Sequence, residues 1–171
     1  MISLKKIYIL IFTIFFYCSH LMALESNVFF IDVDYLLKNS KLGKNILKNL
    51  DELNNKNINL LKKDEEELKK IDNEINNTKN VISKDELEKK VINFRSELKT
   101  YEEKKDKLSK EFTKRRVDQL NDFLNKISPI IQDFMKDNSI SILVEKKNIF
   151  IGSSEYDITE DIILLMNQKF E

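Results

Sequence analysis

Few residues of this chain have types and spacing suited to catalysis. Asp32 and Asp34 stand two positions apart, so a strand would place both carboxylates on one face, and paired carboxylates serve in acid–base chemistry. The alternative interpretation is a strand end followed by a helix cap, a frequent use of aspartate, and we favour it. The only cysteine and the only histidine are Cys18 and His20.

The first 23 residues are typical of a secretory signal peptide. Two lysines precede an apolar run over 7–17, and small and polar residues lead to Ala23 at the expected cleavage site. An uncleaved anchor is the alternative, because 7–24 is long enough to span a bilayer. Cleavage would remove Cys18 and His20, and with them disulfides, thiol nucleophiles and His or Cys metal ligands. We therefore predict an exported protein that is not an enzyme and has no cofactor.

Composition favours long helices over a β-rich fold. The chain has 171 residues, with only two glycines and one proline to supply turns. Its 29 basic and 29 acidic side chains give zero net charge, which argues against a nucleic-acid binder. Two isolated glycines cannot form a phosphate-binding loop.

Two segments carry apolar residues at alternating spacings of three and four, the pattern of a heptad seam. The first runs through Ile46, Leu50, Leu53, Asn57, Leu61, Asp64, Leu68, Ile71 and Ile75. The second runs through Leu87, Val91, Phe94, Leu98, Tyr101, Lys105, Leu108 and Phe112, and resumes from Arg116 to Phe134. An asparagine-rich turn separates them, and Ser83 is placed to cap the second helix. The pattern predicts an antiparallel hairpin arm over 46–127, roughly 50 Å long.

The remaining segments, 24–45 and 128–171, predict a small body that is discontinuous in sequence. We expect a first strand from Val28 to Val33, a helix capped by Asp34, strands over 140–145 and 149–151, and a final helix over 160–170 capped by Thr159. The fold class is thus α+β and mostly helical. So small a body leaves apolar strand edges to be covered by self-association. The candidates for a shared core are Phe29, Ile31, Val33, Ile140, Ile142 and Val144.

Two further sets of residues suggest roles at the junction and along the arm. Gly43 and Pro129 both lie near the arm–body junction, where they could form a hinge or an ordinary kink. Apolar residues off the seam could contact a partner chain, and these are Ile58, Val81, Ile82 and Ile92. For Val81 and Ile82 a local cluster at the arm tip is an equal alternative.

Several motifs together resemble the Skp/OmpH family of periplasmic chaperones. They are Asp34-Tyr35-Leu36-Leu37 followed by 40–44, a charged helical hairpin, the strand 142–145, and a final helix opened by Asp157-Ile158-Thr159. The resemblance implies a jellyfish-like homotrimer whose β body holds three helical arms around a cavity. It also implies an ATP-independent holdase that carries unfolded outer-membrane proteins through the periplasm.

The charge of the arm and the kind of protein both leave alternatives open. Residues 56–116 hold 18 basic and 14 acidic side chains, a net charge of +4, which leaves weak contact with anionic lipid head groups open. We expect no nucleic-acid partner. One alternative is a structural coiled-coil envelope protein without chaperone activity, and another is a prefoldin-like clamp, which the signal peptide disfavours.

Overall fold

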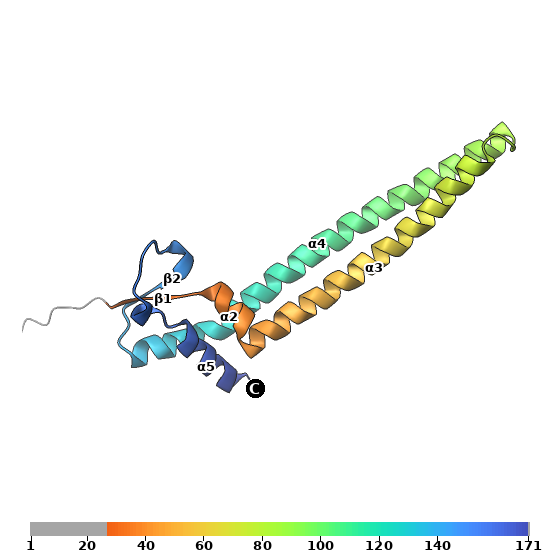
Figure 1. Ribbon diagram of the computed structural model, residues 1–171. Helices are drawn as coiled ribbons and strands as arrows, with labels where there is room; N and C mark the ends of the chain where they lie inside the picture. Colours follow the sequence, from red (N-terminus) through yellow and green to blue (C-terminus); the bar gives the residue numbers. More distant parts are fainter. Residues whose placement is uncertain (1–26, 171) are drawn as a thin grey trace, which may run out of the picture.

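The computed structural model describes residues 27–170 and shows a mostly helical protein with one pair of short strands. The order is β1 (Val28–Ile31), α2 (Val33–Asn39), α3 (Lys41–Thr78), α4 (Lys84–Asp137), β2 (Ile142–Glu145) and α5 (Thr159–Lys169), with two 3₁₀ turns, Lys146–Asn148 and Ser154–Tyr156, before α5. Helices α3 and α4 run side by side away from a small body, which the other elements and the end of α4 form together (Figure 1). The predicted signal peptide lies outside the described residues. No helix within 27–170 has the length and apolar character needed to cross a membrane.

The body joins the two ends of the described chain. Strands β1 and β2 pair in parallel, with Val28 opposite Ile142 and Phe30 opposite Val144. On its other edge β1 meets the segment before α5, where the Ile158 amide donates to the Phe30 carbonyl at 3.1 Å. The whole arm is therefore the crossover between β1 and β2, and the body is discontinuous in sequence.

The predicted third strand at 149–151 is wrong. Phe150 and Ile151 lie in a bend, 97% and 83% exposed. Their β-branched and aromatic character suits a strand, but a strand needs a neighbour. The free edge of β1 is occupied by Asp157 instead.

The predicted caps of two helices need correction. Strand β1 ends at Ile31, and Asp32 rather than Asp34 caps α2, because the Asp32 carboxylate accepts the Tyr35 amide at 2.9 Å. Val33 is therefore the first residue of a helix and not part of a strand. Thr159 begins α5, and its side chain does not cap it.

A clasp formed by Asp157 and Thr159 ties the start of α5 to the end of β1. The Thr159 hydroxyl accepts the Asp32 amide at 2.9 Å and donates to the Asp157 carboxylate, which also accepts the Thr159 amide. Lys146 pairs with the same carboxylate at 2.8 Å. Burial works to raise the pKa of Asp157, but the bonds from Lys146 and Thr159 outweigh it and hold that pKa below its usual value. The clasp leaves buried Thr159 with partners for its polar atoms.

The core of the body gathers apolar side chains from every helix around the strands. The buried members are Ile31, Leu36, Phe123, Ile127, Ile130, Ile140, Ile158, Ile162, Ile163 and Met166. Phe123 and Ile127 lie N-terminal to Pro129, so the last four turns of α4 contribute to the body core. The arm is thus anchored by its own helix running into the body.

The junction between arm and body is tightly packed at Gly43, and helix α4 is continuous at Pro129. Ser40 separates helix α2 from helix α3. Its side chain caps α3 by accepting the Gly43 amide at 3.0 Å. A Cβ at Gly43 would lie 2.0 Å from the Leu37 carbonyl oxygen of α2. Helix α4 runs without a break through Pro129, from Lys84 to Asp137. Close packing explains the glycine, and the hinge stays a prediction.

The arm follows the predicted seam closely. Every seam position of α3 from Ile46 to Ile75 is buried or half-buried. On α4 the seam departs at three positions, since Leu98 is 36% exposed and two further positions differ in other ways. Arg116 is exposed, and Lys104 takes the inward place expected for Lys105, because it pairs with Asp64 of α3 at 2.6 Å. The polar seam residue Asp64 thus has a charged partner across the hairpin.

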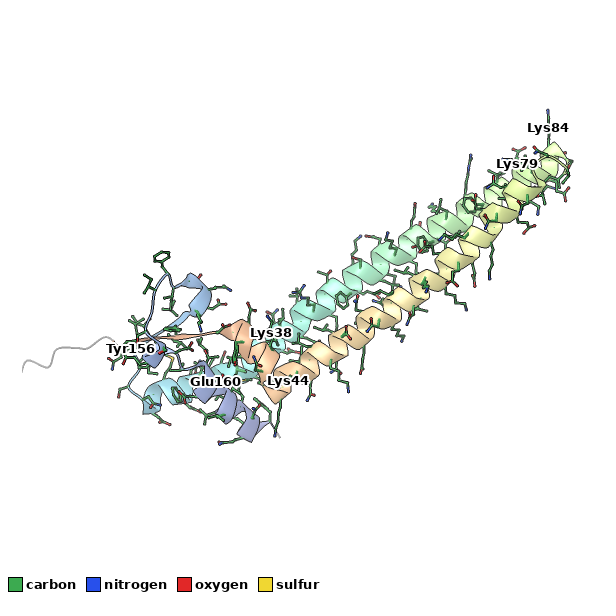
Figure 2. All side chains as sticks on the ribbon, in the orientation of Figure 1. Lys38, Lys44, Lys79, Lys84, Tyr156 and Glu160 are labelled. Carbon is green, nitrogen blue, oxygen red and sulfur yellow. The ribbon has the colours of Figure 1, made fainter. Side chains whose placement is uncertain are left out.

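Helix ends at the arm tip and at the base of α4 agree with the sequence. The Ser83 hydroxyl accepts the Glu86 amide at 3.3 Å, so Ser83 caps α4 as predicted. Asn138 ends α4, also as predicted. Lys79 and Lys84 flank the turn at the tip (Figure 2).

Candidate partner-binding surface on the arm

The hairpin has two distinct long faces, one on each side of the seam. Glu74 and Lys90 each precede a seam position, and they pair across the two helices. Side chains one residue before the seam on α3 and on α4 therefore share one face. Because a helix turns by about 100° per residue, side chains one residue after the seam share the opposite face.

The face formed by residues one position after the seam carries most of the exposed large apolar side chains of the arm. Its members are Leu47 and Ile58 on α3 and Ile92, Val117 and Leu124 on α4, between 37% and 58% exposed. We call these five residues the apolar stripe. The side chains between them on this face are charged or polar. The stripe therefore offers separated apolar contacts rather than one continuous patch.

The opposite face is polar. A shallow hollow of about 350 Å³ on it is lined by Glu67, Glu97, Thr100 and Lys104, among others. Leu60 is the one large exposed apolar side chain on this face within the described residues. The two long faces of the arm therefore differ in the amount of apolar surface that they expose.

The structure places the four predicted contact residues in two groups. Ile58 and Ile92 lie on the apolar stripe, although they come from different helices. Val81 is 80% exposed at the arm tip, while Ile82 beside it is half-buried. Sequence reasoning missed Leu47, Val117 and Leu124, although each of them directly follows a predicted seam position.

The six residues predicted to form a shared core between copies differ in exposure. Ile31 and Ile140 lie in the core of the protomer, Phe29, Val33 and Val144 are partly buried, and Ile142 is 48% exposed. Phe29 packs edge-on against Tyr156, with ring centroids 5.4 Å apart. Val28 opposite Ile142 is 43% exposed. The strand pair therefore presents an uncovered apolar row at its N-terminal end.

Several charged groups near the strand ends pair with one another. Asp32 is a helix cap, and Asp34 lies exposed in the first turn of α2. Lys147 pairs with Glu145 at 2.6 Å, and this hydrogen bond raises the pKa of Lys147. A hydrogen bond with Glu160 raises the pKa of Tyr35. The favoured interpretation of the aspartate pair, a strand end plus a cap, holds with Asp32 as the cap.

Comparison with known proteins identifies the family. The profile of the OmpH family, described as "Outer membrane protein (OmpH-like)", matches residues 27–166. Among curated protein sequences none matches this chain. A crystal structure from Caulobacter crescentus CB15, of a protein described as an OmpH-like outer membrane chaperone, superposes with a TM-score of 0.76 at 16% identity.

That superposition covers 84% of this chain and 85% of the other, so the two proteins share the whole fold, body and arm together. The resemblance carried by the sequence motifs is thereby confirmed. The chain belongs to the OmpH-like outer membrane protein family.

Proposed function

We propose that this protein is an ATP-independent periplasmic holdase. It binds unfolded outer-membrane proteins in a cavity between the helical arms of a homotrimer, prevents their aggregation and assists their delivery to the outer membrane. Family membership supports the proposal, and the observation that carries it is the apolar stripe on one face of each arm. Many weak contacts acting together can hold a chain that has no fixed structure.

The stripe suits an unfolded client better than a folded partner. Its five apolar side chains span most of the arm and are separated by charged ones, so no single contact is strong. An unfolded β-barrel chain presents apolar side chains at irregular spacing, which such a surface can meet in many registers. Release then needs no nucleotide, because each contact exchanges quickly.

Substitution on the two faces of the arm tests the stripe directly. Ile58→Asp removes a stripe residue, while Leu60→Asp makes the same kind of change on the polar face two positions away. Both side chains are exposed, so stability should change by no more than about 0.5 kcal/mol in either variant. We expect Ile58→Asp with Ile92→Asp to raise the chaperone concentration needed to suppress aggregation by about tenfold.

The measurement is turbidity of a urea-denatured porin diluted into ATP-free buffer. Leu60→Asp should behave as the unmodified protein does. An equal loss of protection in the Ile58→Asp, Ile92→Asp double variant and in Leu60→Asp would show that the stripe has no special role. Failure of the unmodified protein to suppress aggregation would favour a structural envelope coiled coil instead.

The homotrimer can be tested by a substitution in the exposed apolar row of the strand pair, which Val28 and Ile142 form. Ile142 is exposed in the protomer and pairs opposite Val28. Ile142→Asp should leave the protomer folded but place a charge in the shared core, which costs several kcal/mol per copy, on the order of 2–7 for a buried polar group. Light scattering should give the mass of three chains for the unmodified protein and of one chain for the variant. A folded monomer of the unmodified protein at micromolar concentration would contradict the assembly.

A further inference from the structure

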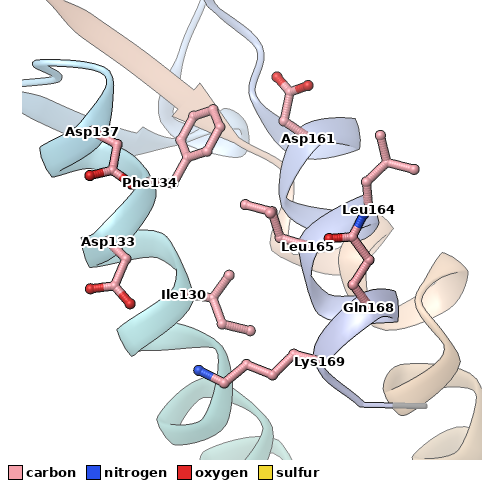
Figure 3. Close-up of a pocket in the computed structure, with 9 residues that line it drawn as sticks. All are labelled: Ile130, Asp133, Phe134, Asp137, Asp161, Leu164, Leu165, Gln168 and Lys169. Atoms are coloured by element: carbon pink, nitrogen blue, oxygen red, sulfur yellow. The ribbon is translucent and has the colours of Figure 1, made fainter.

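A groove on the body, away from the arm tip, lies between the end of α4 and α5 (Figure 3). It encloses about 600 Å³. Its apolar lining comes from Ile130 and Phe134 of α4 and from Leu164 and Leu165 of α5. Leu164 is 60% exposed although it lines an apolar surface, so the groove has room for a further side chain to cover it.

Three carboxylates border this groove. Asp133 and Asp137 lie on the α4 side and Asp161 on the α5 side, while Lys169 is the one cation of the lining (Figure 3). The lining therefore has a net charge of −2. No ion pair or hydrogen bond of the side chains joins any of the three aspartates to another residue within 27–170.

Two of these aspartates are placed against local preference. Asp137 is the last residue of α4, where the helix dipole disfavours a negative charge, and Asp133 stands one turn earlier, where the two carboxylates repel. Asp161 differs, since the first turn of α5 favours an acidic residue. Departures from local preference without compensating contacts are expected where a residue serves a partner.

We propose that this groove docks a cationic amphipathic helix of a partner protein. A third helix laid between α4 and α5 would cover Leu164 and Phe134 with apolar residues at positions i and i+4, the usual way in which a helix fills a groove. Lysine or arginine on its flanks would meet Asp133, Asp137 and Asp161. Charge complementarity thus selects a basic partner, whereas the arm, with its net positive charge, does not attract one.

The position of the groove separates this docking from client binding. The arm extends from one side of the body (Figure 1), and the groove is lined by body residues, from the end of α4 and from α5. A partner helix bound there would leave the apolar stripe uncovered. The chaperone could then be held at a second protein while its arms still carry a client.

A synthetic peptide serves as the probe. It is an amidated helical peptide of Lys, Ala and Leu with Leu at every third or fourth position, labelled for fluorescence anisotropy with the full-length mature protein. We expect Asp133→Asn with Asp137→Asn, and separately Leu164→Ser, to weaken its binding by about tenfold. A peptide with Glu in place of Lys should not bind, and added salt should weaken binding of the basic peptide.

Stripe variants provide the matched control. Ile58→Asp with Ile92→Asp should change peptide affinity less than twofold, whereas the groove variants should leave porin protection unchanged. The Asp137→Asn variant should also melt about 2 °C higher, because it relieves the unfavourable charge at the end of α4. The opposite pattern, in which only stripe variants lose the peptide, would mean that the arms hold it as a client and would overturn the docking site. A change of assembly mass in Leu164→Ser would overturn it too, by making the groove a contact between copies.

Discussion

Gly43→Ala is expected to destabilise the protein by about 3 kcal/mol, the upper end for overpacking a tight contact. The new Cβ would lie 2.0 Å from the Leu37 carbonyl oxygen and 2.6 Å from its carbonyl carbon. These are backbone atoms of α2, so a side-chain rotation cannot relieve the clash and α2 must move away from α3. That movement would uncover Leu36 and Ser40, which are both fully buried.

Whether Gly43→Ala lowers or raises the free energy of unfolding distinguishes the effect of packing from the effect of helix propensity. At an exposed helical site glycine to alanine stabilises by about 1 kcal/mol, so propensity alone predicts a more stable protein. Urea unfolding followed by far-UV circular dichroism, at one fixed protein concentration, measures the difference. Lys44→Ala, at the next position but exposed, is the control and should change little. A higher unfolding midpoint for Gly43→Ala would show that α2 and α3 do not pack as closely as described.

Shortening the arm by two heptads in each helix is expected to abolish protection of a denatured porin while leaving assembly intact. Removal of 62–75 together with 91–104 takes fourteen residues from each of the facing parts of α3 and α4 and shortens the arm by about 21 Å. The deletion removes Ile92 from the apolar stripe and shrinks the space that three arms would enclose. The body core keeps all of its buried residues, because none of them lies in the deleted segments.

A one-sided deletion is the control for this experiment. Removing 62–75 alone would leave Lys104 without Asp64 and put the remaining seam out of register, so the arm itself should unfold. Light scattering should report an unchanged number of chains for the matched deletion, and turbidity should report loss of protection. A matched deletion that still protects the porin as well as the full-length chain would make the arms spacers and move client binding to another surface.

The sequence predicted the helices well because their signals are local. The seam spacing fixes which side of α3 and α4 faces inward, and Ser83 and Asn138 mark helix ends through their own side chains. Features that depend on distant partners were predicted less well. Segment 149–151 has strand-forming residues but no strand edge to join, and Lys104 rather than Lys105 turns inward because Asp64 lies opposite.

The candidate surfaces show the same limit. Ile58 and Ile92 could be identified one at a time as apolar residues off the seam. Their membership of one face depends on how the two helices face each other, and the pairing of Glu74 with Lys90 across the hairpin shows this arrangement. The groove between α4 and α5 could not be predicted, because it depends on how these two helices pack across the intervening residues 138–158.

The parallel pairing of β1 with β2 determines when the body can form during synthesis of the chain. Val28 pairs with Ile142, which is synthesised more than a hundred residues later. Strand β1 therefore keeps an unpaired edge until nearly the whole chain has been made. Such a distant contact is slow to form from an unstructured chain, since closing a long loop costs entropy. The hairpin removes this obstacle: its contacts are closer in sequence, and once it has folded only residues 138–141 separate α4 from β2. The arm is therefore the part of the molecule that sets the order of folding, and a chain cut short within α4 lacks the strand that its first residues need.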